Sequence, residues 1–322
     1  RRNQQTSGNG PATLDEEATS TAEARAIFGR ASPCTLISFP VIEERADDPS
    51  IVLDATVMRQ LGEFVKEIAE AYNPNPFHNF QHASHVVMSV TKLLNHMEAS
   101  SKISVDDPTT QFAVVLTALI HDVDHPGVPN EQLVAEGHAL SKIYKSSIAE
   151  RNSLDVAWGL LKQDSYHELR RAIYRSPAEF EYFRQLMVHS VLVTDLMDKD
   201  LQSERKQRWN EAFEARETSK TRCNGQELVN KQKMALLEHV IQTSDVAHTM
   251  QHWNVYQKWN HCLYQELSQA YSSNRASKDP SEFWYDGEIG FLDAYIIPLA
   301  QRLQDCPAFD ASGQELLHYA KS

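Results

Sequence analysis

Histidine and aspartate residues gather in three short segments of this chain, at spacings suited to metal binding and acid–base chemistry. His78 and His82 are four residues apart, and His121 is followed directly by Asp122. In a helix, positions four apart share one face, so His78 and His82 are predicted to lie together. Asp245 extends an apolar helical stripe, where a carboxylate should not be left unpaired. Together these residues predict one polar site inside an otherwise apolar fold.

The chemistry that these residue types favour is the binding of divalent metal ions. A lone buried histidine is usually a hydrogen-bonded core residue, and a histidine pair alone is a weak signal. The adjacent His121 and Asp122, together with His82 and the distant Asp245, supply both nitrogen and oxygen ligands. Such a set suits a hard-to-borderline ion that keeps open positions for water. With both its oxygens, Asp122 could bridge two ions about 3.5–4 Å apart, which would polarise a phosphate.

The elements that must position these residues are predicted to be helices. From about residue 54 onward, apolar residues recur at three- and four-residue steps, and no convincing period-two alternation predicts a sheet. Loops are predicted at about 216–226 and 272–287. The fold class is therefore all-α, one compact multi-helix domain with a dinuclear metal site at the base of a pocket. The clearest helical runs are Val86–Met97, Gln111–Ile120, Leu169–Ile173, Phe183–Met197, Lys233–Val246 and Trp253–Tyr271.

Composition narrows the range of partners. The 322 residues carry a formal net charge of −13, which argues against a nucleic-acid polymer but allows a small anionic substrate. No segment is apolar enough to span a membrane, and no signal peptide is visible, so we expect a cytoplasmic protein without membrane contact in this stretch. The four cysteines are far apart and predict reduced thiols. Residues 1–25 are predicted to be disordered or extended, and 26–322 to form the domain.

The motifs, taken together and in order, resemble the class I 3′,5′-cyclic-nucleotide phosphodiesterases, within the wider His-Asp metallohydrolases. The resemblance covers the chain from about Val57 to Pro298, nearly its whole length. It implies an all-α catalytic domain that opens the cyclic phosphate of cAMP or cGMP. Its regulatory domains would lie outside this chain, and a homodimer is left open. The segments that carry the resemblance are Phe77-His78-Asn79-Phe80-Gln81-His82-Ala83, His121-Asp122-Val123-Asp124-His125-Pro126-Gly127, Ser146-Ser147-Ile148-Ala149-Glu150, Leu192-Val193-Thr194-Asp195, Asp245 and Glu288-Ile289-Gly290-Phe291.

The resemblance also implies roles for individual residues. The ligands of a tight Zn²⁺ site would be His82, His121, Asp122 and Asp245. A second ion, Mg²⁺ or Mn²⁺, would share Asp122 and be held mostly through waters on His125, Glu150 and Thr194. His78 would be the general acid that protonates the leaving O3′. A metal-bridging hydroxide would attack phosphorus in line and give a 5′-monophosphate.

The base pocket is implied in the same way. Phe291 would stack on the purine, with Leu263 opposite it, and Tyr256 and His248 nearby. The purine-reading glutamine of the family is Glu288 here. A carboxylate only accepts hydrogen bonds, so it suits the two adjacent donors of guanine and disfavours the acceptor N1 of adenine. We therefore expect a preference for cGMP, which a protonated Glu288 would reverse.

A second departure follows Glu150, where the family has a pair of histidines and this chain has Asn152-Ser153. The loss of a supporting histidine predicts weaker binding of the second ion. Two other functions stay open. One is a different His-Asp phosphohydrolase, which would not be expected to share the His78-Asn79 motif or Phe291. The other is a cyclic-nucleotide-binding homologue with weakened catalysis, which would need no general acid.

Overall fold

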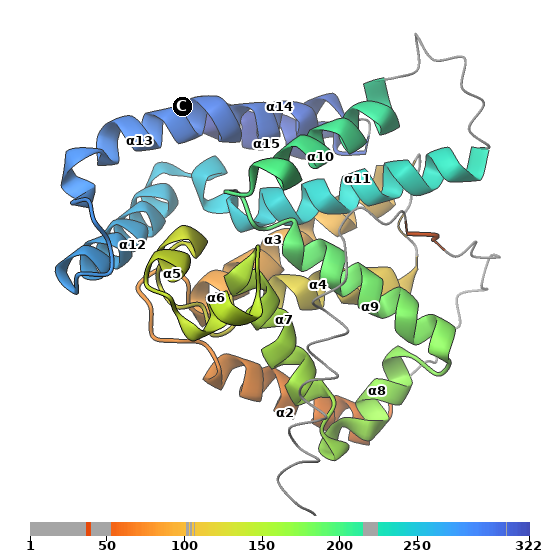
Figure 1. Ribbon diagram of the computed structural model, residues 1–322. Helices are drawn as coiled ribbons and strands as arrows, with labels where there is room; N and C mark the ends of the chain where they lie inside the picture. The colour runs from red at the N-terminus through yellow and green to blue at the C-terminus, as the bar shows by residue number, and fades with distance from the viewer. Residues whose placement is uncertain are drawn as a thin grey trace, which may run out of the picture.

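The structure is a computed structural model that describes residues 37–39, 53–100, 103, 105, 107–214, 225–306 and 308–322. Within these ranges every element is helical and no strand occurs, which confirms that the domain is all-α (Figure 1). The segment 1–25, predicted to be disordered, lies outside the described residues, as do Cys34 and Cys223. Cys262 and Cys306 are free thiols, as expected.

The helices follow one another along the chain with short connections. Several predicted runs lie inside longer helices, and side-chain caps by Asn79 and Asp107 set where two of these helices begin. In order, the helices are α2 (Ala55–Glu70), α3 (Phe80–Ser100), α4 (Pro108–Ile120), α5 (Asn130–Ala135), α6 (Ala139–Ile143), α7 (Ile148–Leu161), η1 (Asp164–Tyr166), α8 (His167–Ile173), α9 (Pro177–Leu192), α10 (Lys199–Trp209), η2 (Asn210–Glu214), α11 (Gly225–Asp245), η4 (Ala247–Met250), α12 (Trp253–Ser272), η5 (Pro280–Glu282), α13 (Trp284–Phe291), η6 (Leu292–Ile296), α14 (Ile297–Asp305) and α15 (Asp310–Lys321).

Helix α4 lies at the centre of the core, and α3, α9 and α11 pack around it (Figure 1). Its most deeply buried side chains are small, which lets neighbouring helices approach closely. They include Ala113, Val114, Thr117 and Ala118. The helix ends at Ile120, so the residues that follow, His121 and Asp122, emerge from the core at one point, as predicted.

Helix α3 begins at Phe80 because Asn79 caps it. The side-chain oxygen of Asn79 accepts the backbone N–H of Gln81 at 2.9 Å and that of His82 at 3.1 Å. This is the usual geometry of an N-cap residue. His78 therefore lies in the bend before the helix, and the prediction that His78 and His82 share a helical face is wrong.

Helix α9 starts and stops earlier than the predicted Phe183–Met197. The carboxylate of Asp195 accepts the backbone N–H groups of Met197 and Asp198, each at 3.2 Å. A side chain that binds nearby N–H groups competes with continuation of the helix. As a result, Thr194 and Asp195 lie in a turn between α9 and α10, which we call the Thr194 turn (residues 193–198).

The segment 272–287, predicted to be a loop, is partly helical, because it contains η5 and the start of α13. Trp284, the first residue of α13, packs edge-on against Tyr264 of α12, with ring centroids 5.2 Å apart. This contact anchors the beginning of α13. The chain then continues through η6 and α14 as one long rod above α11 (Figure 1).

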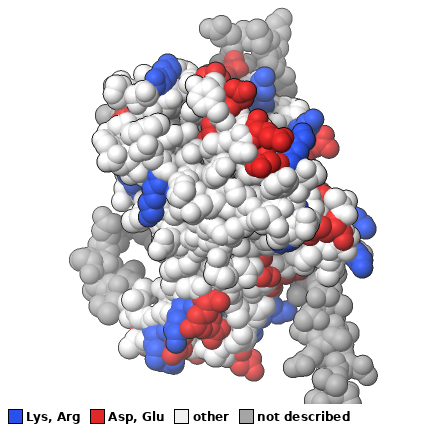
Figure 2. Space-filling view, turned by 90° about the vertical axis from the view of Figure 1, so that its left-hand side faces the viewer, with Lys and Arg blue, Asp and Glu red and all other residues white. Residues whose placement is uncertain are grey.

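Figure 2 shows the side of the molecule on which α5, α12 and α13 lie in Figure 1, and its charged side chains gather near the top, the right-hand edge and the bottom of this view. The middle of this face is broad and largely uncharged. The net negative charge of the protein is therefore not concentrated there. Among the described residues, no helix combines the length and the apolar character that crossing a membrane requires.

Candidate active site

The four predicted metal ligands converge from α3, the end of α4 and the end of α11. His82 Nε2 lies 3.0 Å from Asp245 Oδ1 and 3.7 Å from Asp122 Oδ2. His121 Nε2 lies 3.0 Å from the same Asp122 oxygen and 3.3 Å from the same Asp245 oxygen. Ligand atoms about 2.1 Å from a tetrahedral zinc ion are about 3.4 Å apart. The spacing of these four atoms therefore fits a zinc site.

The electrostatics of this cluster also favour a cation. Burial would lower the pKa of His121, but Asp122 and Asp245 raise it well above its ordinary value. Burial would raise the pKa of Asp245, but His121 and His82 hold it well below its usual range. The buried Nε2 of His121 has no hydrogen-bond partner among the described residues, although it faces both carboxylates. A nitrogen atom in this position is suited to ligate a metal ion, and the residues fit the predicted zinc.

A second group of acidic residues lies beside Asp122. Asn130 Nδ2 donates to Glu150 Oε2 at 2.9 Å and to Asp195 Oδ2 at 3.4 Å. Burial and the nearby Asp195 raise the pKa of Glu150 to about 8, and Asp122 adds to this effect. The hydroxyl of Thr194 donates to the last turn of α9 at 2.7 Å, which leaves its oxygen able to accept. Oxygen ligands of this kind suit Mg²⁺ or Mn²⁺ and their waters. Asn130 was not predicted.

His125 lies against the ring of His78, with centroids 3.9 Å apart. Its Nδ1 accepts the backbone N–H of Gly127 at 3.2 Å, which assigns the proton of the neutral ring to Nε2. Burial and the positive charge of His78 lower the pKa of His125 to about 3. His125 is therefore a neutral hydrogen-bond donor, a state that suits the predicted role of holding water.

Glu266 on α12 is the main residue that the sequence analysis missed. Its Oε2 accepts the backbone N–H groups of Phe77 and His78, both at 2.9 Å, and its Oε1 pairs with His78 Nδ1. Burial would lower the pKa of His78, but Glu266 and Asp122 outweigh this effect and raise it to about 9. Glu266 thus fixes both the position and the protonated state of His78.

A signal for Glu266 exists in the sequence. Together with Trp259 and Ala270, it forms the buried face of α12, at spacings of seven and four residues. A carboxylate on such an apolar stripe needs a partner. The same signal pointed to Asp245, but no motif connects Glu266 with a residue 188 positions earlier.

Asn152 and Ser153 occupy the positions where the resemblance implies histidines. Asn152 Nδ2 donates to Asp124 Oδ2 at 3.0 Å, and Ser153 Oγ donates to the Val123 carbonyl at 2.8 Å. Asp124 has a left-handed backbone, with φ of 57°, and such a residue is held in place by its neighbours. The two replacements therefore still support the loop that carries the metal ligands. The predicted weaker binding of the second ion therefore depends only on the absence of a histidine side chain at these positions, and not on a loss of support for the loop.

Glu288 on α13 is held by side chains of α12. The Tyr256 hydroxyl donates to Glu288 Oε2 at 2.8 Å, and Asn260 Nδ2 donates to the same oxygen. Trp284 Nε1 donates to Asn260 Oδ1 at 3.2 Å, which fixes the orientation of that amide. Glu288 Oε1 receives neither of these donors. Asn260 was not predicted, although it lies one helical turn from both Tyr256 and Leu263.

The remaining predicted pocket residues are Phe291, Leu263 and His248, and they differ in their surroundings. Phe291 stacks on Tyr295, with centroids 5.4 Å apart, and Leu263 is half-buried on α12. His248 is buried beside Phe77, with centroids 5.5 Å apart. His248 therefore lies behind the metal ligands, where it supports the rings around His82, and its contact with a base stays a prediction.

Comparisons with known proteins identify the family of this chain. Residues 77–314 match the family described as 3′5′-cyclic nucleotide phosphodiesterase. A calcium/calmodulin-dependent dual-specificity 3′,5′-cyclic nucleotide phosphodiesterase 1C of Mus musculus is 24% identical over 263 residues, or 77% of this chain and 34% of that protein. A probable 3′,5′-cyclic-AMP phosphodiesterase of Caenorhabditis elegans is 26% identical over 259 residues, or 77% of this chain and 37% of that protein. The chain thus spans about a third of the length of these relatives.

Solved structures show the same fold. The phosphodiesterase domain of a rhodopsin phosphodiesterase from Salpingoeca rosetta aligns with a TM-score of 0.67 and 19% identity, covering 92% of this chain and 93% of that one. A second structure of that domain, from a fusion protein, aligns with a TM-score of 0.63. The family match extends over well more than half of the 322 residues. The chain therefore belongs to the 3′5′-cyclic nucleotide phosphodiesterase family.

Proposed function

We propose that this chain hydrolyses the 3′,5′-cyclic phosphate of a cyclic nucleotide to the 5′-monophosphate, with a preference for cGMP. The observation that carries the proposal is the convergence of four side chains that could hold a metal ion beside the His78–Glu266 pair. A site that only bound nucleotides would not need a histidine held in its protonated form. The cytoplasmic location, a homodimer and regulatory domains outside this chain remain predictions.

The chemistry divides between the metal ions and the side chains of the chain. His82, His121, Asp122 and Asp245 would hold Zn²⁺, and Asp122 with waters on His125, Glu150 and Thr194 would hold Mg²⁺ or Mn²⁺. The two ions would polarise the phosphate and lower the pKa of water to supply the nucleophile. The Nδ1 of His78 is engaged by Glu266, so its Nε2 is the proton donor for the leaving O3′. As that proton leaves, Glu266 keeps the ring in place through the three contacts it makes.

Nucleotide preference is attributed to Glu288. Since Tyr256 and Asn260 both donate to its Oε2, the two-oxygen contact with guanine expected from the sequence is reduced to one oxygen. Oε1 would accept one N–H of guanine, whereas the N1 acceptor of adenine would meet a carboxylate oxygen without a proton between them. This asymmetry supports a preference for cGMP.

Replacing Glu288 with glutamine should lower the cGMP/cAMP ratio of kcat/KM by about tenfold, because a hydrogen bond to a charged group contributes about 1.5–3 kcal/mol. The glutamine amide can present a donor to adenine N1 and so removes the penalty. Steady-state kinetics with both nucleotides measures the ratio. The matched control is Asp286→Asn, which removes an exposed charge from the same helix and should leave the ratio unchanged. An unchanged ratio in Glu288→Gln would assign selectivity elsewhere.

The proposed activity is tested with purified zinc-loaded protein, cAMP and cGMP, in magnesium and then in manganese buffer. We expect turnover to the 5′-monophosphate, faster for cGMP, detected by chromatography of the products. Folded protein that binds a cyclic nucleotide but turns over neither in either buffer would contradict the enzyme and support the binding homologue. Turnover of nucleoside monophosphates or triphosphates instead would support another His-Asp phosphohydrolase.

A further inference from the structure

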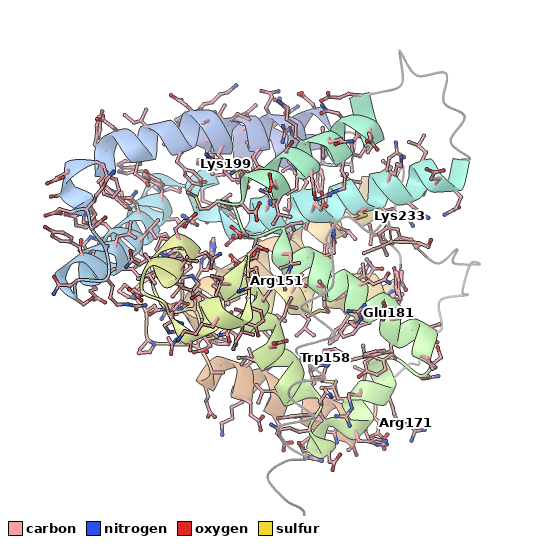
Figure 3. The ribbon with its side chains drawn as sticks, in the orientation of Figure 1. Arg151, Trp158, Arg171, Glu181, Lys199 and Lys233 are labelled. Atoms are coloured by element: carbon pink, nitrogen blue, oxygen red, sulfur yellow. The ribbon has the colours of Figure 1, made fainter. Side chains whose placement is uncertain are left out.

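We propose that Arg205 is a positioning residue for the second metal site, acting through the Thr194 turn. The inference rests on the proposed two-metal function. Arg205 lies on α10 and is only 7% exposed, which is unusual for an arginine. Helix α10 packs against α11, and Figure 3 labels Lys199 at the start of α10 and Lys233 on α11. A buried arginine at this place calls for partners that justify its desolvation.

Its partners are the two backbone carbonyls that flank Thr194. Arg205 Nη1 donates to the carbonyl of Val193 at 3.2 Å and to that of Asp195 at 3.2 Å. One guanidinium nitrogen therefore spans the turn on both sides of the residue predicted to hold a metal-bound water. The Val193 carbonyl also accepts from Gln242 Nε2 of α11 at 3.2 Å. The turn is thus clamped from two helices at once.

This clamp links the turn to both metal positions. Gln242 lies three residues before Asp245 on α11, so it couples the turn to the helix end that carries a zinc ligand. On its other side, the Asp195 carboxylate shares the Asn130 amide with Glu150. Displacement of the turn would therefore move Thr194 and Asp195 relative to Glu150 and Asp245. Small losses of such supporting contacts typically weaken metal binding about 10–100-fold.

The choice of arginine has an electrostatic reason. The carbonyls at the C-terminal end of α9 lack helical partners, and that end carries a partial negative charge. It lies beside the acidic pair Asp195 and Glu150. The guanidinium satisfies these carbonyls and offsets the charge, while the carboxylates remain available to the metal side. A lysine keeps the charge, but a single ammonium on a flexible chain does not reproduce the fixed donor geometry of a guanidinium.

The test is the binding of Mn²⁺ to zinc-loaded protein, followed by electron paramagnetic resonance, with no substrate present. Arg205→Lys is expected to weaken the binding of Mn²⁺ by about tenfold or more. Gln242→Met, which removes the other donor to Val193, should weaken it less and in the same direction, and it serves if Arg205→Lys does not fold. The matched control is Arg208→Lys. Arg208 lies one turn further along α10, and it pairs with the carboxylates of Glu238 at 2.7 Å and Glu204 at 3.5 Å rather than with the carbonyls of the turn.

The outcomes separate this inference from the proposed function. If Arg208→Lys lowers the urea midpoint of unfolding but binds Mn²⁺ like the unchanged protein, while Arg205→Lys loses affinity, the positioning role is supported. Equal losses of Mn²⁺ affinity in both arginine variants would mean that the substitutions destabilise the protein in general, and would overturn the positioning role of Arg205. Normal binding in both Arg205→Lys and Gln242→Met would also overturn it. If the unchanged zinc-loaded protein bound no Mn²⁺, the two-metal proposal itself would fail, and this inference with it.

Discussion

Asp245→Ala is expected to abolish hydrolysis of both cyclic nucleotides and to release most of the zinc. The Asp245 carboxylate lies 3.0 Å from His82 and 3.3 Å from His121, so it is the acidic centre that holds both histidines together. Its removal leaves two buried histidines facing one carboxylate. Because metal-ion catalysis contributes several kcal/mol, and each 1.36 kcal/mol is tenfold in rate, turnover should fall by about 10³-fold or more.

Two measurements check this expectation, the zinc content by mass spectrometry and the rate by product chromatography. Asp245→Asn, which keeps the shape of the side chain, serves as a second variant if the alanine protein does not fold. The control is Asp293→Ala, an exposed aspartate on η6. Zinc content and turnover in both Asp245 variants equal to those of Asp293→Ala would show that the metal lies elsewhere.

The convergence of His82, His121, Asp122 and Asp245 could be predicted from the sequence because its signals are local. His121 and Asp122 follow directly after an apolar helix, and that helix is central to the core. Asp245 interrupts an apolar stripe. In both cases the sequence pattern itself contains the conflict between a charged group and an apolar environment, and a buried metal ion would resolve that conflict.

The residues that orient the site could not be placed in this way, because their roles depend on contacts between distant helices. Glu266 contacts His78, which lies 188 positions earlier in the chain. Asn260 has a role in the site only because α13 places Glu288 against α12. The boundaries of α3 and α9 depend on single capping contacts, by Asn79 and Asp195, that compete with helix propensity. The residues that support the site are thus specified by tertiary packing, whereas the predicted metal ligands are specified by motifs.

His78→Asn is expected to lower kcat for cyclic nucleotides by about 10²–10⁴-fold, with zinc content unchanged. The leaving O3′ is an alkoxide, which needs a proton as the bond to phosphorus breaks, and we propose that His78 donates it. An aryl phosphodiester that releases p-nitrophenolate does not need this proton, so its hydrolysis should be far less sensitive to the same substitution. Equal losses for both substrates would mean that His78 acts on binding or metal geometry rather than as an acid.

If His78 is the general acid, activity should change with pH in one direction. A general acid works in its protonated form. The value of kcat/KM is therefore highest at pH values below the pKa of His78 and falls as the pH rises through that pKa. Glu266 is the largest of the influences that raise this pKa, to about 9 before any effect of bound cations. Glu266→Gln should therefore move the alkaline fall of kcat/KM to lower pH, while His78→Asn should remove it. A fall that stayed at the same pH in both variants would belong to another group and would separate Glu266 from proton donation.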